Sequence, residues 1–204
     1  MRRRALLCVI RWLQRAMILA AAACAAWLFV AWKDATFFQL YARTELRDLV
    51  TDTRGPQTGL PDAPAPLHRV ESVIGVLDVP RLALSVVAVE GDDERTLRVA
   101  AGHLPDTPLP WQEGNASFAG HRDTFFRALR ELRVGDDLEL ATTHGTFRYR
   151  VTRTLIVAPS DVSVLEPGDA TALTLITCYP FTFLGAAPLR FVVQAERVGH
   201  AVVS

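Results

Sequence analysis

The residue with the clearest chemical potential in this 204-residue chain is one cysteine, Cys178. Two other cysteines, Cys8 and Cys24, lie in an apolar N-terminal region, so Cys178 is alone in the rest of the chain. A lone thiol has no partner for an internal disulfide, and is therefore either a buried apolar side chain or a reactive group. An apolar run leads up to Cys178, and Tyr179-Pro180 end it. This pattern predicts a strand end at a rim, which favours a nucleophile.

A nucleophilic thiol needs an activating partner, because only the thiolate attacks and a free thiol has a pKa of about 8.5. Three of the five histidines are expected to be plain surface residues: His68 beside a Pro-rich tract, His144 in a turn and His200 near the C-terminus. His103 and His121 both follow a glycine at the boundary of a predicted element. The residues alone do not choose firmly between these two, although a structural hydrogen bond is the favoured role for His103.

Arg190 is the candidate donor for a developing oxyanion, which a thioester-forming site also requires. It follows Cys178 by twelve residues and begins a predicted strand. If the two strands pair in antiparallel fashion across residues 179–189, Cys178 and Arg190 lie at the same edge of a sheet. The alternative is an outward-facing arginine on an alternating strand.

The elements that must position these residues are short strands separated by Gly, Pro or Asp. Segments rich in Val, Leu, Ile and Phe are predicted as strands over 72–79, 82–90, 116–120, 137–143, 147–158, 172–178 and 189–198. Short helices are predicted over 92–102, capped by Asp92 or Asp93, and over 124–132, with a hairpin turn at 144–146. Seven or eight strands over this length suit a closed barrel or a sandwich.

The N-terminal charges are segregated from the rest. Residues 1–33 hold six basic residues and no acid, whereas the rest of the chain holds 16 basic and 22 acidic residues. Residues 16–32 form an uncharged apolar run of 17 residues, which predicts a transmembrane anchor at the short end of the usual range. The positive-inside rule then puts residues 1–15 in the cytoplasm and the remainder outside, as in a single-pass protein of the cytoplasmic membrane. A cleaved signal peptide is the competing interpretation.

Residues 33–66 are predicted to link the anchor to a folded domain. Residues 34–50 have weak helical periodicity without breakers, which indicates a juxtamembrane helix. Residues 55–66 are rich in proline and glycine, which is typical of an extended, semi-rigid linker. The extracytoplasmic domain is then expected over 67–204.

Composition excludes two classes of protein. Half of the residues are hydrophobic, so the chain is not disordered throughout. The part after Lys33 has a net charge of −6 and contains no lysine, so we expect no nucleic-acid partner. Short acidic groups such as Asp92-Asp93-Glu94 are read as solvated turns, and no metal or other cofactor is expected.

Three segments together resemble the sortase family. TLITC (174–178) is similar to the family's TLxTC signature, AGHRDTFF (119–126) to its histidine segment and APLRFVV (187–193) to its arginine strand. The phrases IGVLDVPRLAL, GHLPDTPLPWQEGN and TCYPF are most similar to class D. The resemblance covers roughly residues 73–198 and keeps the order His, Cys, Arg.

The resemblance implies a membrane-anchored cysteine transpeptidase with a closed eight-stranded β-barrel. Cys178 would attack the carbonyl after Thr in an LPxTG- or LPxTA-like sorting signal of a surface protein, and form an acyl-enzyme. His121, which the family favours over His103, would act as general acid and base, while Arg190 would steady the oxyanion. Thr177 would help to shape the oxyanion site. The acceptor would be an amine of a cell-wall precursor or of another protein.

Two other kinds of function stay open at this point. A plain cysteine peptidase would form the same acyl-enzyme and release it to water, whereas an L,D-transpeptidase is disfavoured because Thr177 precedes the cysteine. An anchored, non-catalytic barrel for assembly or binding is the second alternative. Thiol reactivity discriminates between them, because a buried structural cysteine reacts only after unfolding.

Overall fold

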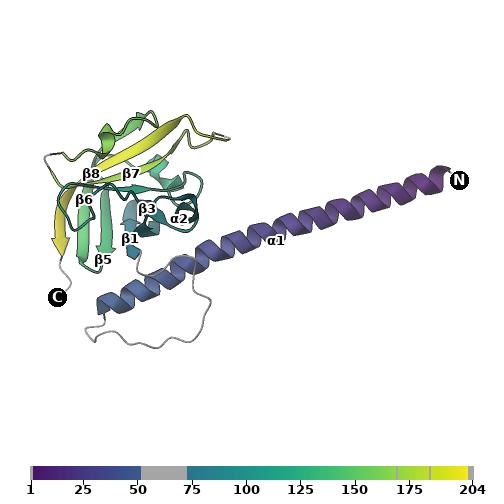
Figure 1. Ribbon diagram of the computed structural model, residues 1–204, viewed down its shortest axis with the longest axis horizontal. Helices are drawn as coiled ribbons and strands as arrows, with labels where there is room; N and C mark the ends of the chain where they lie inside the picture. The colour runs from purple at the N-terminus through teal and green to yellow at the C-terminus, as the bar shows by residue number, and fades with distance from the viewer. Residues whose placement is uncertain (1, 52–72, 169, 184, 202–204) are drawn as a thin grey trace. The chain divides into compact units, whose positions relative to one another are not determined.

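The structure is a computed structural model that describes residues 2–51, 73–168, 170–183 and 185–201 (Figure 1). The chain divides into two compact units, Met1–Phe37 and Phe38–Ser204. The predicted Pro-rich linker at 55–66 and the predicted start of the domain at residue 67 lie outside the described residues.

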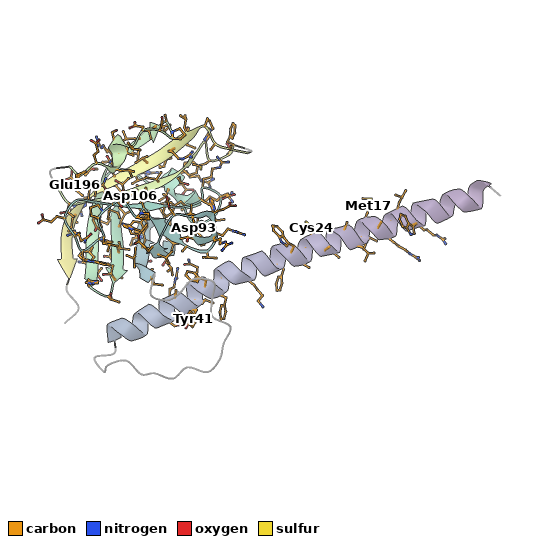
Figure 2. All side chains as sticks on the ribbon, viewed as in Figure 1. Met17, Cys24, Tyr41, Asp93, Asp106 and Glu196 are labelled. Atoms are coloured by element: carbon orange, nitrogen blue, oxygen red, sulfur yellow. The ribbon has the colours of Figure 1, made fainter. Side chains whose placement is uncertain are left out.

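The N-terminal region is one helix, α1, over Arg2–Thr51. The sequence pattern predicts an anchor over 16–32 and a juxtamembrane helix over 34–50; no proline or glycine separates them, so the helix continues through both. Figure 2 labels Met17, Cys24 and Tyr41 along α1. No helix in the described part of the chain is long and apolar enough to cross a membrane, so the predicted anchor is not shown.

Eight strands form the second unit. They are β1 (Val73–Val79), β2 (Leu84–Glu90), β3 (Ala101–His103), β4 (Asn115–Ala119), β5 (Asp137–Thr142), β6 (Gly145–Val157), β7 (Ala172–Tyr179) and β8 (Leu189–Ala201). They close into a barrel in the order β1-β2-β3-β4-β7-β8-β6-β5, which confirms the eight-stranded barrel and excludes the sandwich (Figure 1). Pairing is antiparallel except for β2 with β3 and β4 with β7.

The barrel interior follows from the alternation of apolar side chains along the strands, since successive side chains point to opposite faces. Leu173 and Leu175 of β7 are fully buried in the core, together with Leu138 and Leu140 of β5 and Phe118 of β4. The odd-numbered positions of β7 therefore face inward, and the even-numbered positions face the outside of the barrel.

The region predicted as a helix over 92–102 contains two elements. Helix α2 spans Glu94–Val99, and the Asp93 carboxylate caps it by accepting from two backbone N–H groups. Strand β3 follows, and its Gly102 lies so close to the carbonyl oxygen of Gly91 that an added Cβ would come within 2.3 Å. A three-residue strand carries no period-2 pattern of its own, which is why the sequence interpretation extended the helix over it.

The other local predictions hold in shortened form. Within the predicted helix 124–132, the structure has the 3-10 helix η3 over Arg127–Glu131, which buries Leu129 in the core. The hairpin predicted at 144–146 is present, but its turn is Thr143-His144: Thr142 pairs with Gly145, which has a positive φ of 124° and begins β6. Two further 3-10 turns, η2 (Pro80–Leu82) and η4 (Ser163–Leu165), complete the fold.

The brevity of β3 leaves part of β2 without a neighbouring strand, and side chains of α1 cover this edge. The Gln39 side chain accepts from the Val87 N–H at 2.9 Å and donates to the Val99 carbonyl at 2.7 Å. One turn further along, Arg43 Nη2 donates to the Ser85 carbonyl at 2.6 Å. An uncovered strand edge would present unpaired N–H and C=O groups, so this part of α1 belongs to the barrel unit.

Candidate active site

Cys178 lies near the end of β7, the strand between β4 and β8 in the barrel. Its side chain is partly buried, and the alternation of β7 puts it on the outer face. Cys178 is a free thiol. The predicted strand end at a rim is therefore present, and the thiol is not part of the interior core.

Arg190 lies directly opposite Cys178 in the antiparallel pair of β7 and β8. Residues that are directly opposite point to the same face, with Cβ atoms roughly 4.5 to 5.5 Å apart. The pairing predicted across residues 179–189 is thus confirmed. The guanidinium is partly buried, and its Nη1 donates to the Leu189 carbonyl at 3.1 Å and more weakly to Ala187 at 3.4 Å.

His121 reaches the same end of the sheet from the other side of β7. Strand β4 runs parallel to β7 with Ala119 opposite Ile176, and the Gly120 N–H donates to the Ile176 carbonyl at 3.1 Å. His121 follows Ala119 by two residues, as Cys178 follows Ile176 by two. The topology therefore brings the segment that carries His121 and the strand that carries Arg190 to opposite sides of β7.

Thr177 ties the end of β4 to β7. Its side chain is 2% exposed, and its hydroxyl donates to the Gly120 carbonyl at 2.7 Å. The contact holds the residue before His121 against the residue before Cys178. The hydroxyl hydrogen is used in this contact. The contribution of Thr177 to an oxyanion site stays a prediction.

Close packing fixes the chain at the turn that carries His121. A Cβ on Gly120 would lie 2.6 Å from the Phe126 ring, so only glycine fits there without displacement. The Phe126 N–H closes the turn by donating to the His121 carbonyl at 3.0 Å. Because Phe126 is fully buried, the backbone of the histidine segment is anchored on the core.

The structure separates His103 from this group. Its ring is 1% exposed, with Nδ1 2.9 Å from a Glu90 carboxylate oxygen and Nε2 3.1 Å from the Pro108 carbonyl. The structural hydrogen bond expected for His103 is thereby confirmed.

Of the remaining histidines, the structure describes the side chain of His144 alone. His144 is exposed in the β5–β6 turn and stacks on Trp111, with ring centroids 3.9 Å apart. His68 and the side chain of His200 lie outside what the structure describes.

One residue of this region was missed by the sequence interpretation. Arg122, the neighbour of His121, donates from Nη2 to the Phe183 carbonyl at 2.6 Å and to the Gly185 carbonyl at 3.0 Å. Both acceptors belong to the loop between β7 and β8, which joins Cys178 to Arg190. The sequence offered one indication of this role, a cation directly after the candidate histidine. The loop that Arg122 binds is distant in sequence, so the contact itself could not be predicted.

Two concavities lie on the barrel, and neither is lined by Cys178, His121 or Arg190. One of about 370 Å³ lies over the first residues of β7 and is lined by Ser163 and Glu166 of the preceding connection and by Gln194 of β8. It begins at Ala172, six residues from Cys178 along an extended strand, or roughly 20 Å. The other, of about 360 Å³, lies between residues 82–86 and residues 124–131, behind the histidine segment.

The described residues contain no group of three His, Cys, Asp or Glu side chains that could hold a metal ion. The candidate reactive groups at this end of β7 are a thiol, an imidazole and a guanidinium. This set suits acyl transfer through a thioester.

Known proteins similar to this chain share one description. The sequence model of the Sortase domain matches residues 77–198. Sortase D of Bacillus subtilis (strain 168) is 38% identical over 125 residues, which are 61% of this chain and 63% of that protein. Sortase A of Listeria monocytogenes is 27% identical over 112 residues, or 53% of this chain and 50% of that protein. The match thus spans less than two thirds of either relative.

A solved structure gives the same result. The Sortase D5 transpeptidase of Clostridium perfringens superposes with a TM-score of 0.57 at 30% identity, over 62% of this chain and 79% of that chain. The shared part corresponds in extent to the barrel.

Proposed function

The chain belongs to the sortase family, and we propose that it is a cysteine transpeptidase that cleaves an LPxTG- or LPxTA-like sorting signal after Thr. Cys178 forms the acyl-enzyme, and an amine at the cell surface releases it. The observation that carries the proposal is that Arg190 pairs directly with Cys178 on one side of β7, while β4, the strand that precedes His121, pairs with β7 on the other side.

In the first half of the reaction, the Cys178 thiolate attacks the carbonyl carbon of the Thr in the sorting signal, which belongs to the peptide bond that breaks. The negative charge moves to the carbonyl oxygen, where the Arg190 guanidinium stabilises it by hydrogen bonding. The His121 imidazolium gives its proton to the leaving amine as the peptide bond breaks. The products of this half are a thioester on Cys178 and a free C-terminal fragment.

In the second half, neutral His121 takes a proton from the incoming amine as its nitrogen attacks the thioester carbonyl. The C–S bond breaks, a new amide bond forms, and the thiolate and imidazolium return to their starting state. Each proton that His121 gives in one half is recovered in the other. Water in place of the amine gives hydrolysis, so the acceptor decides between transpeptidase and peptidase.

The outer face of β7 supports the binding of an extended peptide. Between the concavity at Ala172 and Cys178, this face is bounded by β4 and β8, and the 3-10 helix η4 lies in the connection before β7. A bound sorting signal that runs along this face would bring its Thr to Cys178. The acceptor is an amine of a cell-wall precursor or of another surface protein.

The proposed location is the cytoplasmic membrane, with the barrel outside. The support comes from the sequence: the apolar run 16–32 and the basic residues before it. In this arrangement residues 1–15 are cytoplasmic, and the partners of the barrel are surface proteins that have already crossed the membrane.

The proposal is tested with the full chain in detergent micelles. Fluorogenic LPxTG- and LPxTA-type peptides are incubated with the protein, with and without triglycine as the amine acceptor, and Cys178→Ala is the control. Mass spectrometry reads the acyl-enzyme and the products. We expect cleavage after Thr, a Cys178 adduct and triglycine joined to the new end.

Other outcomes contradict specific parts of the proposal. Cleavage that ignores triglycine and other amines would indicate a hydrolase. A folded protein that forms no adduct on any peptide, and whose thiol does not react with alkylating agents, would indicate a non-catalytic barrel.

A further inference from the structure

The loop between β7 and β8 joins the nucleophile strand to the arginine strand, and its attachment decides how the two strand ends are held. Its first turn is closed by a hydrogen bond of 3.2 Å from the Phe183 N–H to the Pro180 carbonyl. Gly185, further along, has a φ of 92°, a conformation that favours glycine. The carbonyls of Phe183 and Gly185 are the two that accept from Arg122.

Arg122 is suited to connect this loop with the histidine segment. One nitrogen, Nη2, donates both of its hydrogens, to Phe183 at 2.6 Å and to Gly185 at 3.0 Å. Hydrogen bonds from a charged donor are the stronger class, and a planar guanidinium directs them rigidly. A lysine ammonium at the same position would be a flexible point charge without this fork.

The base from which Arg122 acts is itself anchored. The preceding residues are held by the Thr177–Gly120 hydrogen bond and by the packing of Gly120 on Phe126. The backbone from which the Arg122 side chain extends is therefore fixed. Arg122 binds the β7–β8 loop, whose two ends lead to Cys178 and Arg190.

We propose that Arg122 is a positioning residue, which locks the β7–β8 loop onto the histidine segment and so keeps His121 in register with Cys178 and Arg190. The effect on turnover rests on the proposed function, whereas the effect on the loop and on the thiol does not. Loss of the clamp frees the loop, and the three reactive groups no longer hold one arrangement.

The test compares Arg122→Ala and Arg122→Lys with a matched control, Arg127→Ala. Arg127 is an exposed arginine of η3, close in sequence to Arg122. All variants are made in the full chain in micelles, with His121→Ala as a reference. Three quantities are measured: amide hydrogen exchange of residues 181–187, the rate of Cys178 alkylation by iodoacetamide against pH, and kcat and KM for a cleaved sorting peptide.

For Arg122→Ala we expect exchange in the loop to accelerate at least ten-fold. The pH profile of alkylation should shift toward that of His121→Ala, because the imidazole no longer faces the thiol in a fixed geometry. The value of kcat should fall at least ten-fold while KM changes less than three-fold. Arg122→Lys should give intermediate values of loop exchange, alkylation and kcat, and Arg127→Ala should match the unchanged protein in all three.

Specific results overturn the inference. If the loop exchanges its amide hydrogens at the same rate in Arg122→Ala as in Arg127→Ala, Arg122 does not hold the loop. Faster loop exchange with an unchanged alkylation profile and unchanged kcat would make Arg122 a structural residue only. If Arg122→Ala does not fold, Arg122→Lys decides by the same criteria. If the unchanged protein cleaves no peptide, the proposed function fails, and the exchange and alkylation results still decide the role of Arg122.

Discussion

Thr177 donates its hydroxyl hydrogen to the carbonyl oxygen of Gly120 at 2.7 Å, so the residue before Cys178 holds the residue before His121. Strands β4 and β7 are parallel neighbours, yet more than fifty residues separate these two positions along the chain. The pair therefore couples the segment that leads to His121 with the strand that leads to Cys178. Its contribution can be measured apart from that of the reactive groups.

Thr177→Val keeps the shape of the side chain and removes the hydrogen bond. The buried Gly120 carbonyl then loses a donor, which should lower the free energy of unfolding by about 1 to 3 kcal/mol. We also expect alkylation of Cys178 at neutral pH to slow roughly ten-fold, because His121 is no longer held in place. Urea unfolding and iodoacetamide kinetics measure the two effects. Thr177→Ser keeps the hydroxyl, so it should restore most of the stability and most of the alkylation rate. A Thr177→Ser protein as impaired as Thr177→Val would show that the hydrogen bond to Gly120 does not account for these effects.

Arg190→Lys tests the oxyanion role. Lysine keeps the charge but lacks the planar, two-pronged donor, so kcat/KM for a sorting peptide should fall roughly 100-fold with little change in stability. The matched control is Arg148→Lys on β6, where the exposed guanidinium pairs with Glu139 at 3.0 Å. Arg148→Lys should keep full activity. An Arg190→Lys protein that turns over like this control would demote Arg190 to a plain strand residue.

The ion pair of Arg81 with Asp136 predicts a pH dependence of stability. Arg81 donates to both Asp136 carboxylate oxygens, and this hydrogen bonding holds the pKa of Asp136 below its ordinary value of 3.8. A carboxyl whose pKa is lowered on folding stabilises the fold above its unfolded pKa, and this contribution is lost as the pH falls through the folded value. Asp136→Asn should therefore be less stable than the unchanged protein at neutral pH.

The difference in the free energy of unfolding between Asp136→Asn and the unchanged protein should disappear only in acid, below the ordinary pKa of the carboxyl. Urea unfolding at about pH 7 and at steps down to about pH 2 measures it. Asp137→Asn is the control, because its partner Arg150 and Asp137 itself are both exposed by more than half. A gap between Asp136→Asn and the unchanged protein that stays constant across this range would show that the carboxylate charge does not stabilise the fold.

Gln39→Ala tests whether α1 covers the edge of β2. Removing the side chain leaves the Val87 N–H and the Val99 carbonyl without their partner, which should lower the free energy of unfolding of the barrel by about 1 to 3 kcal/mol. The neighbouring Leu40 is 62% exposed, so Leu40→Ala should leave stability unchanged. Denaturant unfolding of the full chain in micelles measures both. Equal stability of the two variants would mean that the edge does not depend on Gln39.

Local patterns in the sequence predicted the strands that carry Cys178 and Arg190 and their pairing, because the two residues lie close together on either side of one loop. The same reasoning predicted a hairpin turn at 144–146, which begins one residue later than the turn at 143–144 in the structure. It overextended the helix beyond Val99, since the three residues of β3 are too few to show a period. It also divided α1 into two segments, although nothing between residues 32 and 34 breaks a helix.

The residues alone left His103 and His121 open as partners of the thiol, and the tertiary structure places the two differently. They look alike in sequence, because each follows a glycine at the end of an apolar run. Parallel pairing of β4 with β7 brings the segment that carries His121 to the end of β7, whereas the His103 ring is buried against a carboxylate and a loop carbonyl. Pairing of strands so far apart in sequence depends on closure of the whole barrel, which no local pattern encodes. The contact of Arg122 with the β7–β8 loop was hidden for the same reason.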